Sequence, residues 1–353
     1  MLDNIEYIYL LIIVGLLLVW RTRARPEQKA TISRLVCFCL IFFAGFRYYV
    51  GTDYRGYTKM YLAILQEGRY YDIEWGYYWM VKFFGAIDGT PQIVFFVFSF
   101  ATIYFIYKFI EHFSDNVELS WIIFLCIGPY FLSTFNGMRQ WLATAMFAYS
   151  LRYVKEDNFK KYALLNAFGA LFHYSTVILI PLYWVLKAKN FSLVKILATY
   201  VVFQFCAMLG IINFLAEKLH ATSYLEGDAA FEMDWSYYIF LLMAVCFMLL
   251  HTVMPQITDD LCIFNNMNAL SGLSVFLAFT TSGMSNMIFT RFNVFFFIGY
   301  IILVPAVLMR IKEPELKRLI TFAVVALCIA YYFYITSTAE DLTPYTMKFM
   351  LFY

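Results

Sequence analysis

The sequence predicts an all-α polytopic membrane protein. Hydrophobic residues make up 63% of the 353-residue chain, charged residues make up 14%, and the mean hydropathy is +0.69. Soluble chains are about 45–50% apolar and about 25% charged. The apolar residues form blocks of roughly 17–22, the length at which a helix crosses about 30 Å of hydrocarbon. Runs such as VFFVFSFATIYFIYKFI lack the alternation that a membrane β-barrel requires, so we expect a helical bundle.

The charges around the first apolar block predict the orientation of the chain. Acidic residues precede this block, and Arg21, Arg23 and Arg25 follow it. A cleavable secretory signal has the opposite arrangement, and no small-residue cleavage site follows. The positive-inside rule therefore predicts that the chain starts outside the cell and that residues 21–34 lie in the cytoplasm.

The later blocks predict about ten full transmembrane helices in a single domain, 1–353. The expected spans are 4–20, 31–46, 91–109, 119–136, 138–154, 194–212, 236–254, 262–282, 289–309 and 318–336. Lysines flank both ends of the block 162–186, so a single crossing would place several of them outside. We expect instead a broken hairpin of two half-helices, each too short to span, with His173 at its tip. The acidic loop 213–235 and the C-terminus then lie outside.

The segment 47–90 is too polar to cross a bilayer. Its aromatic residues recur at helical spacing, which predicts two amphipathic helices on the outer leaflet, opened by Asp53 and Glu74. Tyrosine and tryptophan are typical of membrane interfaces, and their ring faces also stack on sugars. The segment is therefore either an interfacial belt or an extracytoplasmic carbohydrate platform. The sugar-binding candidates are Tyr54, Tyr57, Trp75 and Tyr78.

Three arginines, Arg47, Arg139 and Arg291, stand at the outer ends of predicted spans, against the usual charge bias. Drawing such a charge into the bilayer costs about 2.5–3.5 kcal/mol on insertion scales. Arg139 follows the turn signal Asn136-Gly137, so it falls in a first helical turn, where backbone N–H groups and the helix dipole favour an anion. A guanidinium binds phosphate oxygens in bidentate fashion. The arginines are candidates for a diphosphate site; the alternative is contact with lipid phosphates or a nearby acid.

The candidates for proton transfer are His173, Asp53 and Glu74. His173 lies in the apolar run ALFHYSTVILIP, and an imidazole exchanges a proton near neutral pH, although a histidine there could equally be a core residue. The two acids could equally be partners of a helix dipole. The seven cysteines all lie in apolar blocks without metal-ligand spacing. We therefore expect no disulfide framework, no metal and no cofactor.

Five strings along the chain form a recognisable series. They are GTDYRGYTKMY (51–61), EWGYYWMVKF (74–83), NGMRQWLATAMFAYSL (136–151), FHYSTVILIPLYWVL (172–186) and PYTMKFMLFY (344–353). Together they resemble the EpsG-like branch of the Wzy-type O-antigen and exopolysaccharide polymerases. The series runs in order over nearly the whole chain and is weakest from about 190 to 280.

The resemblance implies a GT-C-like glycosyltransferase that polymerises oligosaccharide repeat units carried on undecaprenyl diphosphate, at the outer face of a bacterial inner membrane. The product would be O-antigen, capsule or exopolysaccharide. Arg139, helped by the other two arginines, would stabilise the departing diphosphate, and His173 or one of the two acids would take the acceptor proton. The implied partners are the lipid-linked oligosaccharide, membrane lipids and a protein that regulates chain length, with no nucleic acid.

Two other classes of function remain open at this point. A flippase for lipid-linked oligosaccharides would account for arginines inside a helical bundle, but it would typically have both termini inside. A membrane O-acyltransferase would account for His173, but it has no need for several outer arginines.

Overall fold

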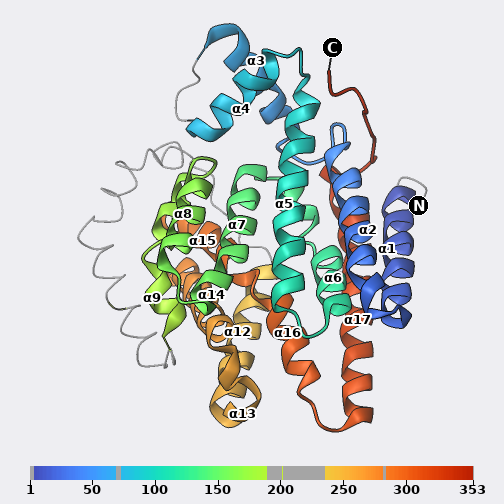
Figure 1. The fold of residues 1–353 in the computed structure, drawn as a ribbon, viewed down its shortest axis with the longest axis vertical. Coiled ribbons are helices and arrows are strands. Elements are labelled where there is room, and N and C mark those ends of the chain that lie inside the picture. The colour runs from blue at the N-terminus through green and yellow to red at the C-terminus, as the bar shows by residue number, and fades with distance from the viewer. Residues whose placement is uncertain (1–3, 69–72, 189–200, 202–234, 281–283, 353) are drawn as a thin grey trace.

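In the computed structural model of the chain, the described residues are 4–68, 73–188, 201, 235–280 and 284–352. They are built from helices (Figure 1), with strand-like pairing only at the isolated antiparallel bridges Arg47–Met347 and Gly89–Phe352. The all-α prediction is confirmed for this part of the chain. Apart from residue 201, the predicted span 194–212 lies outside the described residues, and so does the predicted loop 213–235 up to its last residue.

Within the described ranges, five helices are long and apolar enough to cross a membrane. They are α1 (Ile5–Arg23), α2 (Pro26–Gly45), α5 (Pro91–Phe113), the stretch Pro255–Phe279 that contains most of α14 (Cys262–Thr280), and α17 (Pro314–Thr338). A sixth forms if the bent pair α15 (Met284–Phe297) and α16 (Tyr300–Met309) counts as one span; the bend is 41°. The protein is therefore a polytopic membrane protein, whereas the predicted number of ten spans is not confirmed.

The predicted span 119–136 is wrong as a single helix. α6 (Val117–Cys126) is only ten residues long, and a turn leads to the short 3-10 helix η1 (Leu132–Phe135). The turn contains Gly128-Pro129. Proline lacks an N–H and disfavours helical backbone in the residue before it, so the helix stops here.

The predicted hairpin around His173 is present as a break in the helical path. α8 (Phe159–Ala170) ends three residues before His173, and η2 (Tyr174–Leu179) and α9 (Leu182–Lys187) return the chain. The Tyr183 hydroxyl donates to the Asp157 carboxylate (2.9 Å), which also pairs with Lys187, so the return leg ends where the outgoing leg began. The second leg is not the continuous half-helix that we expected, because Pro181 interrupts the helical hydrogen bonds.

Two amphipathic helices form in the segment 47–90, as predicted. They are α3 (Tyr54–Glu67) and α4 (Trp75–Gly85), and Asp53 and Glu74 are their N-caps. Both helices lie at one end of the molecule (Figure 1), and each buries an aromatic or aliphatic face against α5. This end carries the start of α7 (Met138–Lys155) and the hairpin tip.

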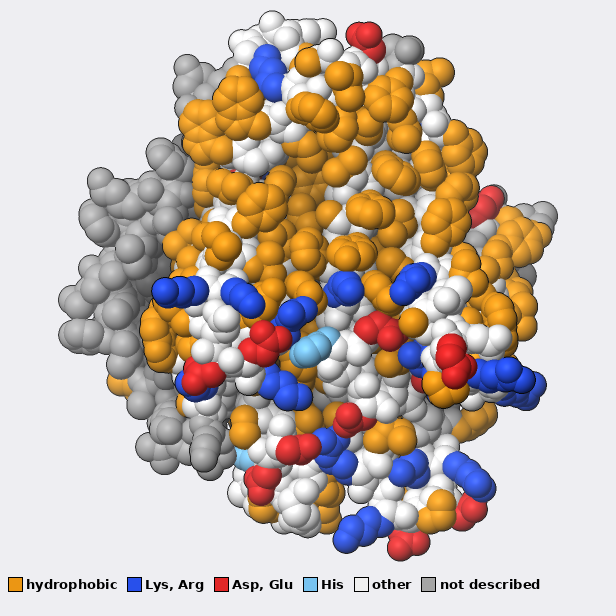
Figure 2. Space-filling model, in the orientation of Figure 1, with side chains coloured by type: hydrophobic (Ala, Val, Ile, Leu, Met, Phe, Trp, Pro, Cys, Tyr) orange, Lys and Arg blue, Asp and Glu red, His pale blue; other side chains and the backbone are white. Residues whose placement is uncertain are grey.

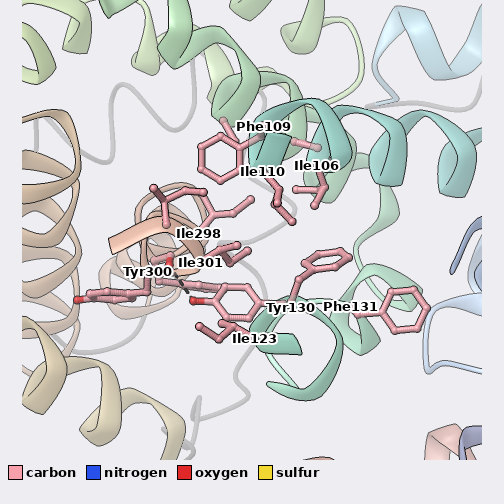
Figure 3. Packing of buried hydrophobic residues seen from close by; sticks show 14 of the residues in the cluster. Ile106, Phe109, Ile110, Ile123, Tyr130, Phe131, Ile298, Tyr300 and Ile301 are labelled. Carbon is pink, nitrogen blue, oxygen red and sulfur yellow. Dashed lines mark hydrogen bonds between the residues drawn. The ribbon is translucent and has the colours of Figure 1, made fainter. Parts of the chain in front are cut away.

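The centre of the bundle is formed by α2, α5, α7 and α8, which pack against one another in that order, while α12 (Trp235–Val253) packs on α14. Figure 3 shows Ile106 and Ile110 of α5 beside Ile301 of α16. In the same cluster the Tyr130 hydroxyl donates to the Phe297 carbonyl (2.9 Å). Between helices in lipid, such contacts stabilise through close van der Waals packing rather than through exclusion of water.

Charged side chains gather at the end of the molecule opposite α3 and α4, below a broad hydrophobic band (Figure 2). Ion pairs join the ends of several helices. The buried Arg21 guanidinium lies 2.8 Å from the Glu118 carboxylate, and Arg310 pairs with Asp115 (2.6 Å) and Asp260 (2.5 Å). The positive-inside rule predicts that this charged end faces the cytoplasm.

Membrane orientation can be tested with single cysteines in a cysteine-free background. Ala86, the C-cap of α4, should be outside, and Ala188, the C-cap of α9, should be inside. An impermeant thiol reagent should therefore label Ala86→Cys in intact cells and Ala188→Cys only after permeabilisation. Labelling of Ala188→Cys from outside would show that the block 162–186 crosses the membrane, which would invert every later span.

Candidate functional site

A polar cavity of about 310 Å³ lies where the start of α7, the hairpin tip and α15 meet the loop before α3. The residues that line it are Asp53, Tyr57, Gly137, Arg139, Gln140, His173 and Arg291. Four of them are predicted proton-transfer or diphosphate-binding residues, and Tyr57 is a predicted sugar-binding residue. Residues as far apart in sequence as Asp53 and Arg291 thus line one cavity, and only the fold brings them together.

Arg139 is held rigidly at the start of α7. Gly137, the N-cap of this helix, has a φ of +57°, in the left-handed region that glycine adopts without strain. The Arg139 guanidinium carbon lies 5.7 Å from the ring centroid of Tyr57 and 5.5 Å from that of Tyr77, and the guanidinium forms an ion pair with Glu74. Cation–π contacts of this kind contribute about 0.5–2 kcal/mol each. Arg139 therefore presents a fixed cation to the cavity.

Glu74 lies behind the cavity wall and contacts two of its lining residues. It is buried, forms an ion pair with Arg139, and has one carboxylate oxygen 3.5 Å from His173 Nδ1. Burial opposes ionisation, but the hydrogen bond with His173 and the charge of Arg139 outweigh it and lower the pKa of Glu74 below its ordinary value. Glu74 is therefore ionised at neutral pH, and it suits the role of an anionic partner better than that of a base.

The contact with Glu74 also orients His173. When Nδ1 of an imidazole faces a carboxylate, Nε2 is the nitrogen that remains for a substrate. His173 is the N-cap of η2, where the hairpin turns, and its side chain is 13% exposed. The His173 side chain therefore borders the cavity, while its Nδ1 is held by Glu74.

Asp53 joins the loop before α3 to the start of α7. Its carboxylate accepts a hydrogen bond from the Gly137 N–H (2.7 Å), and its own N–H donates to the Asn136 side chain (3.4 Å). A carboxylate at this position satisfies one of the N–H groups that a helix start leaves open and interacts favourably with the helix dipole. Asp53 thus occupies part of the anion site that we predicted at the start of α7.

Gln140 is a cavity residue that the sequence reasoning missed. Its side-chain amide donates to the Arg291 carbonyl (2.8 Å) and so joins α7 to α15. The sequence feature that could have identified Gln140 is its place next to Arg139 in the first turn of α7. The Arg291 side chain is exposed and lines the cavity from α15.

Arg47 was expected to bind diphosphate, but it is not among the residues that line the cavity. It is 1% exposed, and its guanidinium donates to the carbonyls of Ala44 (2.5 Å) and Phe135 (3.2 Å). The guanidinium carbon also lies 5.1 Å from the ring centroid of Phe95 and 4.8 Å from that of Phe135. Because these groups surround its charge, Arg47 supports the turn before α7 from behind, and we assign it no substrate contact.

Apart from Tyr57, which lines the cavity, the predicted sugar-binding residues separate into two groups. Tyr54 is buried, stacks on Phe95 (4.1 Å, 7°) and donates to Gln92 (2.7 Å), so we assign its ring no sugar contact. Trp75 on α4 is 42% exposed and stands nearly perpendicular to Tyr78 (6.1 Å, 84°). These two rings lie on the helix that Glu74 opens, next to the cavity wall rather than on it.

A second, apolar groove of about 110 Å³ lies between α4, α5, α7 and α8. Every residue that lines it is apolar; Ala101, Leu142 and Phe172 are among them. Leu142 is one helical turn beyond Arg139, and Phe172 directly precedes His173. The groove and the polar cavity therefore share two walls, α7 and the hairpin.

The fold and these two neighbouring hollows define a polytopic helical membrane protein in which a charged cavity adjoins an apolar groove. Among the described residues, no group of three or more His, Cys, Asp or Glu side chains is arranged to hold a metal ion.

The chain matches the model of the EpsG family over residues 31–347, and it belongs to this family of polysaccharide polymerases. The prediction drawn from the five strings is thereby confirmed. Comparison with curated proteins and with solved structures found no significant match.

Proposed function

We propose that this protein polymerises oligosaccharide repeat units carried on undecaprenyl diphosphate, by glycosyl transfer at the outer face of a bacterial inner membrane. Family membership supports the polymerase part of the proposal. The observation that carries the substrate class is the cavity with Arg139 and Arg291 beside the apolar groove. An amphiphile with an anionic head and a long apolar tail needs both environments next to each other.

The reaction assigns one task to each group. An acceptor hydroxyl oxygen attacks the anomeric carbon of the donor chain, and the bond from that carbon to the diphosphate oxygen breaks. The electron pair stays on the departing undecaprenyl diphosphate, whose charge Arg139 and Arg291 stabilise. The hydroxyl proton passes to Nε2 of His173, and Glu74 stabilises the imidazolium that forms.

His173 suits the role of base better than either acid. Glu74 is ionised, but its oxygens face Arg139 and His173. Asp53 accepts a hydrogen bond from the Gly137 N–H (2.7 Å), so its carboxylate is already engaged at the start of α7. His173, in contrast, lines the cavity, and because its Nδ1 faces Glu74, Nε2 is the nitrogen that remains for the acceptor hydroxyl.

The remaining roles follow from position. Trp75 and Tyr78 on α4 offer ring faces beside the cavity, so we assign them to the sugar chain. The apolar groove takes the first isoprene units of the lipid. A separate protein that regulates chain length remains a proposed partner.

A cell that lacks this protein separates the proposal from its rivals. Loss of a polymerase should leave single repeat units on the outer side, loss of a flippase should leave none there, and loss of an acyltransferase should leave chain length unchanged. We expect single repeats. Purified protein with a lipid-linked repeat unit should then lengthen the saccharide and release undecaprenyl diphosphate. The proposal would be refuted if loss of the protein left the polymer in cells unchanged and if the purified protein left the repeat unit unchanged.

A further inference from the structure

Three segments that are distant in sequence meet behind the start of α7. The Gly51 N–H donates to the Asp341 carbonyl (2.8 Å), and the Asn136 side-chain amide donates to the Asp341 carboxylate (3.1 Å). The oxygen of the same Asn136 amide accepts from the Asp53 N–H (3.4 Å). The Asn136 side chain is therefore held at both ends, by Asp341 on one side and by Asp53 on the other.

The place where Gly51, Asn136 and Asp341 meet, which we call the junction, leaves little room for adjustment. A Cβ added to Gly51 would lie 2.8 Å from the Asn136 side-chain oxygen and 3.1 Å from the Phe135 carbonyl, and Gly51 has a φ of +96°. Gly137 follows directly, with its own positive φ and its N–H bound to Asp53. The position of the Asn136 side chain therefore determines how α7 begins.

The segment that carries Asp341 is itself fixed to the rest of the molecule. Tyr345 is buried and stacks on Phe43 (4.0 Å, 13°). Besides the bond from Gly51, three backbone bonds join this segment to neighbouring loops: Tyr48 N–H to Thr346 carbonyl, Lys348 N–H to Phe46 carbonyl and Thr90 N–H to Leu351 carbonyl, each 2.8 Å. We call residues 341–352 the strap. Because the strap is anchored along its length, Asp341 is a firm support for Asn136.

We propose that Asp341 is a positioning residue of the cavity: through Asn136 it holds the turn that aims Asp53 and Arg139 at the substrate. It does not line the cavity, so we assign it no contact with the substrate. Nothing in local sequence marks it, since it lies 205 residues from Asn136. The expected effect on polymerisation rests on the proposed function, whereas the expected effect on the turn does not.

Three variants test this role. Asp341→Ala removes the acceptor, Asp341→Asn keeps a side-chain oxygen that can accept from Asn136, and Thr346→Val removes a side-chain bond from the same strap without touching the junction. We expect Asp341→Ala to lower kcat about ten- to hundredfold, because small misplacements of catalytic groups have effects of this size. Asp341→Asn should retain most of the rate, and Thr346→Val should match the wild type. A defect in Asp341→Asn equal to that of Asp341→Ala would overturn the proposal.

A readout that needs no reaction is hydrogen exchange across residues 134–141, measured by mass spectrometry on the purified full chain. Exchange should quicken in Asp341→Ala and stay at the wild-type rate in the other two variants. Wild-type exchange and wild-type kcat in Asp341→Ala would overturn the proposal. If exchange responds as expected while even the wild type makes no polymer, the positioning role stands and the proposed function fails.

A double substitution tests the proposal even if Asp341→Ala does not accumulate in the membrane. Asn136→Asp alone sets two carboxylates against each other and should lose activity, because neither can donate. Adding Asp341→Asn restores one donor and one acceptor across the junction, so the double variant should recover polymer length. A double variant no better than Asn136→Asp would overturn the proposal.

Discussion

Replacement of Arg139 by lysine is expected to abolish most polymer formation although the positive charge is kept. A lysine ammonium cannot reproduce the bidentate contact of a guanidinium with phosphate oxygens, nor its planar contact with the rings of Tyr57 and Tyr77. Removal of one positioned donor to a developing anion typically costs about 10²–10³ in turnover. Polymer length in cells and turnover of the purified protein are the measurements.

Two further variants keep this result interpretable. Arg139→Ala should be equally inactive, but it leaves the buried Glu74 without its cation, which destabilises; Arg139→Lys still supplies a charge to Glu74 and so separates folding from chemistry. The matched control is Arg152→Lys on the same helix, whose ion pair with Glu156 (3.4 Å) lies at the other end of α7. Full-length polymer from Arg139→Lys at normal abundance would show that Arg139 is a generic cation and would disprove the diphosphate contact.

Replacement of His173 by alanine is expected to leave mostly single-repeat product, with a loss of about 10²–10⁴ in rate, the usual contribution of positioned proton transfer. His173→Gln nearly matches the reach and polarity of the side chain and can still bond to Glu74, but it cannot take up a proton. It should therefore rescue little. Polymer length and membrane abundance must be measured on the same samples.

A structural histidine would behave in the opposite way. Alanine would then lower the amount of folded protein, and glutamine would preserve both abundance and activity. His251→Gln is a suitable control, because His251 bonds to Thr258 on another helix, outside the cavity lining. Full-length polymer from His173→Gln at normal abundance would remove His173 from the proton-transfer role and make Asp53 the next candidate.

Local sequence was sufficient for the features that depend on a few consecutive residues. The length and polarity of the apolar blocks predicted α1, α2, α5 and α17, since the bilayer alone sets that length. Aromatic spacing predicted α3 and α4 together with their N-caps, Asp53 and Glu74. The basic residues on both sides of 162–186 predicted a chain reversal, and the helix does break at His173. Two local errors within the described residues both involve proline: Gly128-Pro129 should have ended the helix predicted over 119–136, and Pro181 should have interrupted the second half of the hairpin.

By itself, then, the sequence determined that this is a helical membrane protein of the EpsG family, and it identified several residues that line one cavity. Only the tertiary structure decided that Arg47 is enclosed by carbonyls and rings, that Glu74 is an ionised partner of Arg139 and His173, and that Asp341 accepts a hydrogen bond from Asn136 in the turn before α7. The physical reason is that a membrane helix is apolar on nearly every side. Its sequence therefore carries little record of which face meets a neighbouring helix, and the partners of its few polar groups are determined by packing.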